Sequence, residues 1–231
     1  MAAVDRTDDG AWRVGMKPRA LLLWLAAYAI AMALVEAAIV VHLRHVYYPE
    51  NPLALFPLRL LGADDLALEL ARELATVVMI LAVALLAARG FMRRFAAFVY
   101  VFGLWDLFYY IWLKVYLGWP DRWLEWDILF LIPWPWFGPW LAPALIALLF
   151  ALWGGWVLAM PRDLRLRRTD ALLFVTGALL ALAAFLAPAW PLLAGGAAAL
   201  HGWVPGTFAW PLYGAGLAGM AVALLRMVRA H

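Results

Sequence analysis

An aspartate lies near the middle of an apolar stretch that is long enough to cross a membrane. Residues 95–117 read FAAFVYVFGLWDLFYYIWLKVYL, with Asp106 close to the centre. About 20 residues span the hydrocarbon core, and a carboxylate at mid-depth costs about 3 kcal/mol on insertion scales. Spacings of three or four residues put four residues on one helix face: Gly103, Asp106, Tyr110 and Lys114. We interpret this face as the wall of a polar site inside a helix bundle.

The two preceding apolar stretches carry ionisable residues at a similar predicted depth. Glu36 lies about two turns from the outer end of the first stretch, and Glu73 lies equally far from the outer end of the second. The predicted substrate-binding residues are therefore Glu36, Arg72, Glu73, Asp106, Tyr110 and Lys114. Further candidates are Arg44, Glu69 and Tyr109. In this hypothesis Asp106 is the central acceptor, and Arg72 and Lys114 are its cationic partners.

Three functions are compatible with these charges. Buried charges in helix bundles usually pair, so the residues could belong to a non-catalytic structural subunit of a larger membrane complex. The mixed charges could instead bind or transport a small polar substrate, an ion or a lipid headgroup. The carboxylates could also serve acid–base or metal chemistry in a membrane-embedded enzyme. We favour the binding or transport function, because the nearby Arg72 and Lys114 disfavour a metal.

The sequence identifies no cofactor and no metal site. His42 and His45 are three residues apart at the end of the first apolar stretch, where histidines more often form interfacial hydrogen bonds than bind metal. The glycines of Gly214–Gly219 match GxGxxG, but they lie inside an apolar span, which indicates close helix packing rather than dinucleotide binding. The chain has neither cysteine nor serine, which excludes cysteine and serine nucleophiles.

The composition is that of a membrane protein. Hydrophobic residues make up 68% of the 231 residues and charged residues only 14%, compared with about 25% charged in soluble domains. We predict one all-α integral membrane domain over residues 1–231, with a polar tail at 1–18 whose first ten residues are disordered. The first span is expected to be retained rather than cleaved as a signal peptide. Six transmembrane helices are predicted at about 20–43, 66–88, 95–117, 141–160, 171–187 and 208–228.

Two segments between the spans are unusual. Residues 119–140 are rich in tryptophan and proline, and their apolar run is too short to span. We predict a short interfacial helix or re-entrant loop there, around 121–132. Residues 188–206 contain no charged side chain, and we expect them to lie on the membrane or to dip into it.

The distribution of basic residues predicts the orientation. Thirteen of the 18 lysines and arginines fall in the tails and loops that six spans would place on one side. The positive-inside rule then puts both termini in the cytoplasm, and the organisation suits a bacterial inner membrane. The expected partners are the lipid bilayer and other membrane subunits. Nucleic acid is not an expected partner, because the basic residues sit in short loops beside apolar runs.

Overall fold

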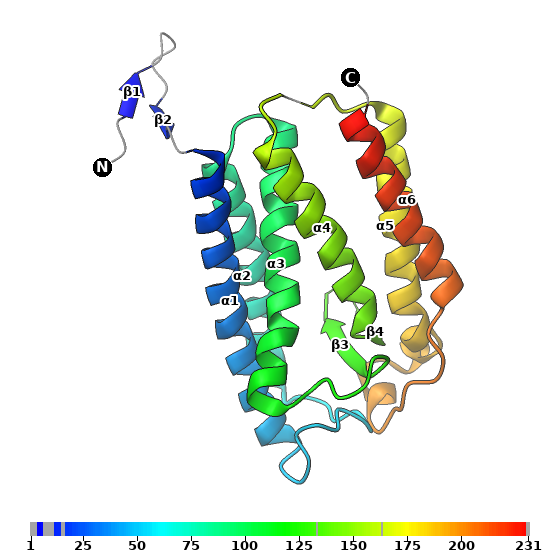
Figure 1. The fold of residues 1–231 in the computed structure, drawn as a ribbon. Coiled ribbons are helices and arrows are strands. Elements are labelled where there is room, and N and C mark those ends of the chain that lie inside the picture. The colour runs from blue at the N-terminus through cyan, green and yellow to red at the C-terminus, as the bar shows by residue number, and fades with distance from the viewer. Residues whose placement is uncertain (1–3, 7–11, 15–16, 133, 163, 230–231) are drawn as a thin grey trace.

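The predicted bundle of six membrane-spanning helices is confirmed. A computed structural model describes residues 4–6, 12–14, 17–132, 134–162 and 164–229. Within these ranges, six helices are long and apolar enough to cross a membrane. They are α1 (Pro18–Tyr47), α2 (Ala63–Ala87), α3 (Phe91–Leu117), α4 (Leu141–Ala159), α5 (Arg168–Leu186) and α6 (Trp210–Arg229). The first turn of α1 and the last turn of α6 lie at the same end of the bundle (Figure 1).

Helix α3 is the central helix of the first four. It packs against α1, α2 and α4, and small residues bring it close to α4. A β-carbon built on Gly103 would lie 2.7 Å from the backbone nitrogen of Ala151, and one built on Gly154 would lie 2.5 Å from the carbonyl oxygen of Ala96. Gly103 therefore faces α4 rather than a polar site. Our placement of Gly103 on the site wall was wrong.

Helices α5 and α6 form a second closely packed pair. Gly177 on α5 and Gly216 on α6 face each other, and a β-carbon on either would lie 2.6 Å from the carbonyl oxygen of the other. Gly216 belongs to the GxGxxG match, so this glycine serves helix packing, as its apolar surroundings indicate. In Figure 1 the two helices stand beside α4 at the C-terminal side of the bundle.

The tryptophan-rich segment forms a β-hairpin rather than the predicted interfacial helix or re-entrant loop. Strand β3 (Trp126–Phe130) pairs antiparallel with β4 (Trp136–Pro139), with Ile128 opposite Phe137. Aromatic and β-branched residues favour strands, and the prolines prevent a helix. The prediction that the first ten residues are disordered was wrong for Val4–Arg6. These residues form β1, which pairs antiparallel with β2 (Trp12–Val14). Residues 1–3 and 7–11 lie outside the described residues.

The end of the bundle opposite the termini is closed by three packed segments. They are residues 49–62, the β3–β4 hairpin and the region of two 3₁₀ helices, η1 (Ala187–Gly195) and η2 (Ala197–Leu200). The backbone N–H of Leu58 donates to the carbonyl oxygen of Trp203 at 2.9 Å, and Gly202 N–H donates back to Leu58 at 2.8 Å. Leu58, Phe137 and Leu200 are buried together. We call these three segments the cap.

Candidate functional site

A cavity of about 590 Å³ lies beneath the cap. Helices α1, α2 and α3 and the β3–β4 hairpin all contribute to its lining. Eight of the nine residues that the sequence suggested line it together: Glu36, Arg44, Glu69, Arg72, Glu73, Asp106, Tyr109 and Tyr110. Their approach follows from helical spacing, which places each on the inner face of its own helix. Their role in binding stays a prediction.

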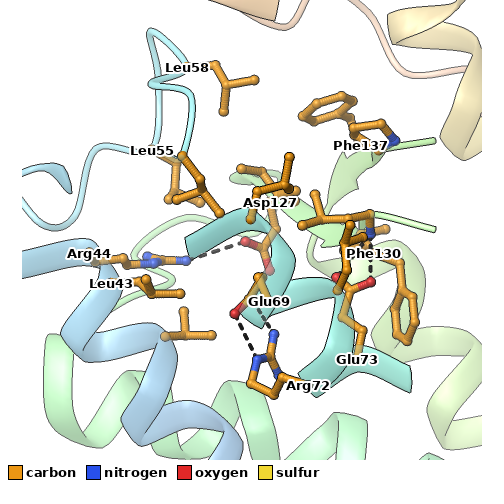
Figure 2. A pocket seen from close by; sticks show the side chains of 18 of the residues that line it. Leu43, Arg44, Leu55, Leu58, Glu69, Arg72, Glu73, Asp127, Phe130 and Phe137 are labelled. Atoms are coloured by element: carbon orange, nitrogen blue, oxygen red, sulfur yellow. Dashed lines mark hydrogen bonds and ion pairs between the residues drawn. The ribbon is translucent and has the colours of Figure 1, made fainter. Parts of the chain in front are cut away.

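Arg72 lies at the centre of the charged part of the cavity. It forms ion pairs with Glu36 from α1 and with Glu69, which is one turn before it on α2. Its Nε donates to Glu69 at 2.9 Å (Figure 2). Thr76 on α2 also donates to Glu36, at 3.2 Å. These contacts link α2 to α1 through buried side chains, which is the pairing that the structural alternative expects of Glu36.

Glu73 connects α2 to the hairpin. Both of its carboxylate oxygens accept the backbone N–H of Leu131 at 3.0 Å. Figure 2 shows this carboxylate directed toward the hairpin, beside Phe130. Leu131 directly follows β3, so the bond satisfies a backbone donor that the hairpin ladder leaves free. Glu73 forms no ion pair with any described residue.

Asp127 is a site residue that the sequence analysis missed. It lies on β3, is buried, and accepts a hydrogen bond from Arg44 at 3.3 Å and another from the hydroxyl of Tyr110 at 3.2 Å. The Arg44 guanidinium also stacks over the ring of Trp119, 4.0 Å from its centroid. One signal was present, since Asp127 directly precedes the apolar run of residues 128–132. The expectation of an interfacial segment concealed it.

The burial of Asp127 predicts a pH dependence of stability. Burial raises the pKa of its carboxyl group to about 6, although Arg44 acts in the opposite direction. An aspartate in an unfolded chain has a pKa of about 3.9, so the folded state binds the proton more tightly. Asp127 should therefore contribute about 1 kcal/mol more to the free energy of unfolding at pH 5 than at pH 7.

Unfolding of the purified protein at the two pH values, followed by tryptophan fluorescence, measures this contribution. Asp127→Asn removes the titrating group, so the variant should lose this part of the pH dependence. Loss of the ion pair with Arg44 should lower the stability of the variant at both pH values. This loss does not affect the comparison, because the readout is the difference in stability between pH 7 and pH 5. An identical pH dependence in the two proteins would contradict the assignment.

Asp106 lines the same cavity but lacks the partners that were predicted for it. Among the described residues, none donates a hydrogen bond to its buried Oδ2 atom, and none forms an ion pair with it. Arg72, one of the predicted cationic partners, is engaged by Glu36 and Glu69 instead. Asp106 is thus a cavity-lining carboxylate whose Oδ2 has no donor among the described residues.

Lys114, the other predicted partner, does not reach the cavity. Its side chain is exposed and its Nζ donates to the carbonyl oxygens of Gly118 at 2.7 Å and Pro120 at 2.9 Å. A lysine in the last turn of a helix is drawn to the unpaired carbonyls and away from the apolar interior. Lys114 is therefore the one predicted site residue that the structure does not bring to this cavity. It also lies 3.9 Å from Asp121.

The two candidate histidines lie outside the cavity. His42 and His45 are both exposed, and Nδ1 of His45 is 2.8 Å from the carbonyl oxygen of Val41. Over the described ranges, no group of three or more His, Asp or Glu side chains is placed to hold a metal ion. The residues that converge are instead carboxylates and arginines, which suit hydrogen bonding and ion pairing.

The remainder of the cavity lining is apolar. Figure 2 shows Leu55 and Leu58 of the 49–62 segment above the charged residues, with Phe137 across from them. Leu43, Leu70 and Phe130 also line the cavity. Charged and apolar linings in one cavity provide an amphipathic environment, which can hold a molecule with a polar and an apolar part.

Six apolar helices around a cavity with charged and apolar linings define the architecture of a multi-pass helical membrane protein. Comparisons of the chain with models of known protein families, with curated proteins and with solved structures found no match.

Proposed function

We propose that this chain is a multi-pass protein of a bacterial inner membrane, and that its cavity binds the polar headgroup of an amphipathic molecule. Both termini face the cytoplasm in this proposal, so the cap and the cavity face outward. The basic residues support this orientation. The start of α3, which carries Arg93 and Arg94, and the end of α6, which carries Arg226, lie at the bundle end where α1 begins (Figure 1). The α4–α5 connection, which carries Arg162, lies at the same end, in keeping with the positive-inside rule.

The amphipathic lining of the cavity is the observation that carries the proposal. A site for a small soluble ion needs polar groups alone, whereas this cavity combines ionisable side chains with leucines and aromatic rings. Its volume of about 590 Å³ lies within the range of sites for small molecules, about 300–1,000 Å³. A headgroup and the adjoining part of one apolar chain match this combination.

The structural-subunit alternative has its own supporting observation. Arg72 is paired with both Glu36 and Glu69, so its guanidinium requires no ligand to neutralise it. The alternative does not account for Asp106, whose Oδ2 is buried with no donor from the described residues. In a purely structural protein the cavity variants below should affect stability and leave bound lipid unchanged.

Two tryptophan substitutions on α2 test the proposal. Leu66 lines the cavity, whereas Leu68 does not and is 71% exposed. Leu66→Trp should fill part of the cavity and displace a bound amphiphile, and Leu68→Trp should not. Native mass spectrometry of the proteins extracted in mild detergent counts the lipid molecules that each retains.

We expect one tightly retained amphiphile on the wild-type protein and on Leu68→Trp, and none on Leu66→Trp. Thermal unfolding of each variant in the same detergent controls for misfolding. The proposal fails if the wild-type protein retains no amphiphile, or if the two folded variants retain it equally.

A further inference from the structure

The ionisable residues of the cavity carry more carboxylates than cations. The carboxylates are those of Glu36, Glu69, Glu73, Asp106 and Asp127, and the guanidinium groups are those of Arg44, Arg59 and Arg72. Arg59 is half-exposed and pairs with Glu50 outside the cavity, at 3.2 Å. An excess of carboxylates in a buried site favours a ligand with positive charge.

The arginines inside the cavity are already neutralised. Arg44 pairs with Asp127, and Arg72 pairs with two carboxylates, Glu36 and Glu69. Neither arginine therefore provides a free positive charge for an anionic headgroup. Two of the cavity carboxylates form no ion pair with a described residue, and these are Asp106 and Glu73.

Asp106 supplies a hydrogen-bond acceptor that has no donor among the described residues. Its buried Oδ2 receives no donor from the described residues, and Tyr110, one turn along α3, donates to Asp127 instead. An ionised carboxylate accepts strong hydrogen bonds from charged donors. A primary ammonium group has three N–H donors, whereas a quaternary ammonium group has none.

We propose that the headgroup bound in this cavity carries a primary amine, and that Asp106 is the residue that binds it. This inference rests on the proposed function and names the chemical class of the ligand. Glu73 contributes negative charge from the neighbouring helix while its oxygens hold the hairpin. Arg44 lines the same cavity, and its Nε and Nη1 donate to none of the described residues. These two donors can bind an oxygen atom of the ligand that lies next to the amine.

Four single-chain amphiphiles of equal length test the headgroup. Dodecylamine, dodecyltrimethylammonium, dodecyl phosphate and dodecanol differ only in the group attached to the chain. Their affinities for the purified full-length protein in a neutral detergent are measured by competition with a bound brominated dodecanol, which quenches the cavity-lining Trp105 and Trp134. We expect dodecylamine to bind about tenfold more tightly than dodecanol, a difference of about 1.4 kcal/mol.

Asp106→Asn assigns the preference to one residue. Asparagine keeps the shape and removes the negative charge, so the variant should bind dodecylamine and dodecanol equally. Asp121→Asn is the matched control, because Asp121 is an exposed acid outside the cavity, and it should keep the wild-type preference. Asp106 forms no ion pair with the described residues, so its replacement should leave the unfolding temperature almost unchanged.

The outcomes separate the two proposals. If none of the four amphiphiles binds, the proposed function fails and the headgroup inference fails with it. If they bind with equal affinity, or if dodecyl phosphate or dodecyltrimethylammonium binds most tightly, only the inference is overturned. If Asp106→Asn does not fold, the preference of the wild-type protein among the four still decides the question.

The primary amine could belong to a membrane lipid or to a single-chain molecule. Native mass spectrometry with added phosphatidylethanolamine or phosphatidylcholine distinguishes these sources. Preferential retention of phosphatidylethanolamine identifies a lipid, and retention of dodecylamine alone identifies a single-chain amine. Preferential retention of phosphatidylcholine contradicts the inference, because its quaternary headgroup has no N–H donor.

Discussion

Arg72→Met should destabilise the protein more than any other replacement of a cavity side chain. The guanidinium pairs with Glu36 and Glu69, and the Arg72 side chain is only 15% exposed. Its removal leaves two carboxylates close together in a buried environment without a counter-ion. Breaking a buried ion pair in this way costs about 3–5 kcal/mol. Helix α2 should also lose its attachment to α1.

Thermal unfolding in detergent, followed by tryptophan fluorescence, measures the effect. For a chain of this length, 1 kcal/mol corresponds to about 2–4 °C, so the midpoint should fall by about 10 °C. Lys114→Met is the control, because this lysine is exposed and its pairing with Asp121 should contribute less than about 1 kcal/mol. A midpoint for Arg72→Met within about 3 °C of wild type would contradict the buried ion cluster.

A compensating variant separates charge from packing. Replacing Glu36 and Glu69 by glutamine in the Arg72→Met background removes the two unpaired charges. We expect this triple variant to recover most of the lost stability, since a neutral replacement of a buried ion cluster is often tolerated. If the triple variant is as unstable as Arg72→Met, the loss comes from packing of the arginine side chain.

Gly103→Ala should also lower the stability of the protein substantially. A single added methyl group at this position would meet the backbone of α4 at Ala147 and Ala151, at 2.7 Å from the Ala151 nitrogen. Backbone atoms cannot move aside as a side chain can, so α3 and α4 must separate. Overpacking of this kind costs about 1–3 kcal/mol, and the separation would also disturb the cavity wall that α3 carries.

Gly214→Ala is a matched control for this substitution. Gly214 lies within α6, and a β-carbon there would have nothing within 4 Å. The change should be neutral or stabilise the helix by up to about 1 kcal/mol, because alanine has the higher helix propensity. Opposite shifts of the unfolding temperature for the two variants would confirm the close contact of α3 with α4. Equal shifts of the unfolding temperature would exclude this close contact.

The six spans could be predicted because they depend on local properties of the chain. A run of about 20 apolar residues must form a helix in a membrane, since no water is available for its backbone groups. The α4 helix begins at Leu141 as predicted, and α3 ends at Leu117 as predicted. The convergence of eight charged and aromatic candidates on one cavity also followed from helical periodicity and depth alone.

Helical periodicity did not determine which neighbours Gly103 and Lys114 contact. Periodicity assigned Gly103 and Lys114 to the face of Asp106, but it does not say which neighbouring helix each side chain meets. Gly103 packs against α4, and Lys114 turns to the carbonyls that follow its own helix. The side-chain length of lysine and the absence of a side chain in glycine decide these contacts only once the helices are placed.

The sequence by itself determined the number, extent and apolar character of the helices and the group of ionisable residues in the first three. Only the tertiary structure decided which charges neutralise one another. It brought Asp127 from the hairpin to Arg44, gave Arg72 to Glu36 and Glu69, and left Asp106 without a partner among the described residues. The physical reason is that hydropathy acts over one helix length, whereas an ion pair depends on the packing of separate elements.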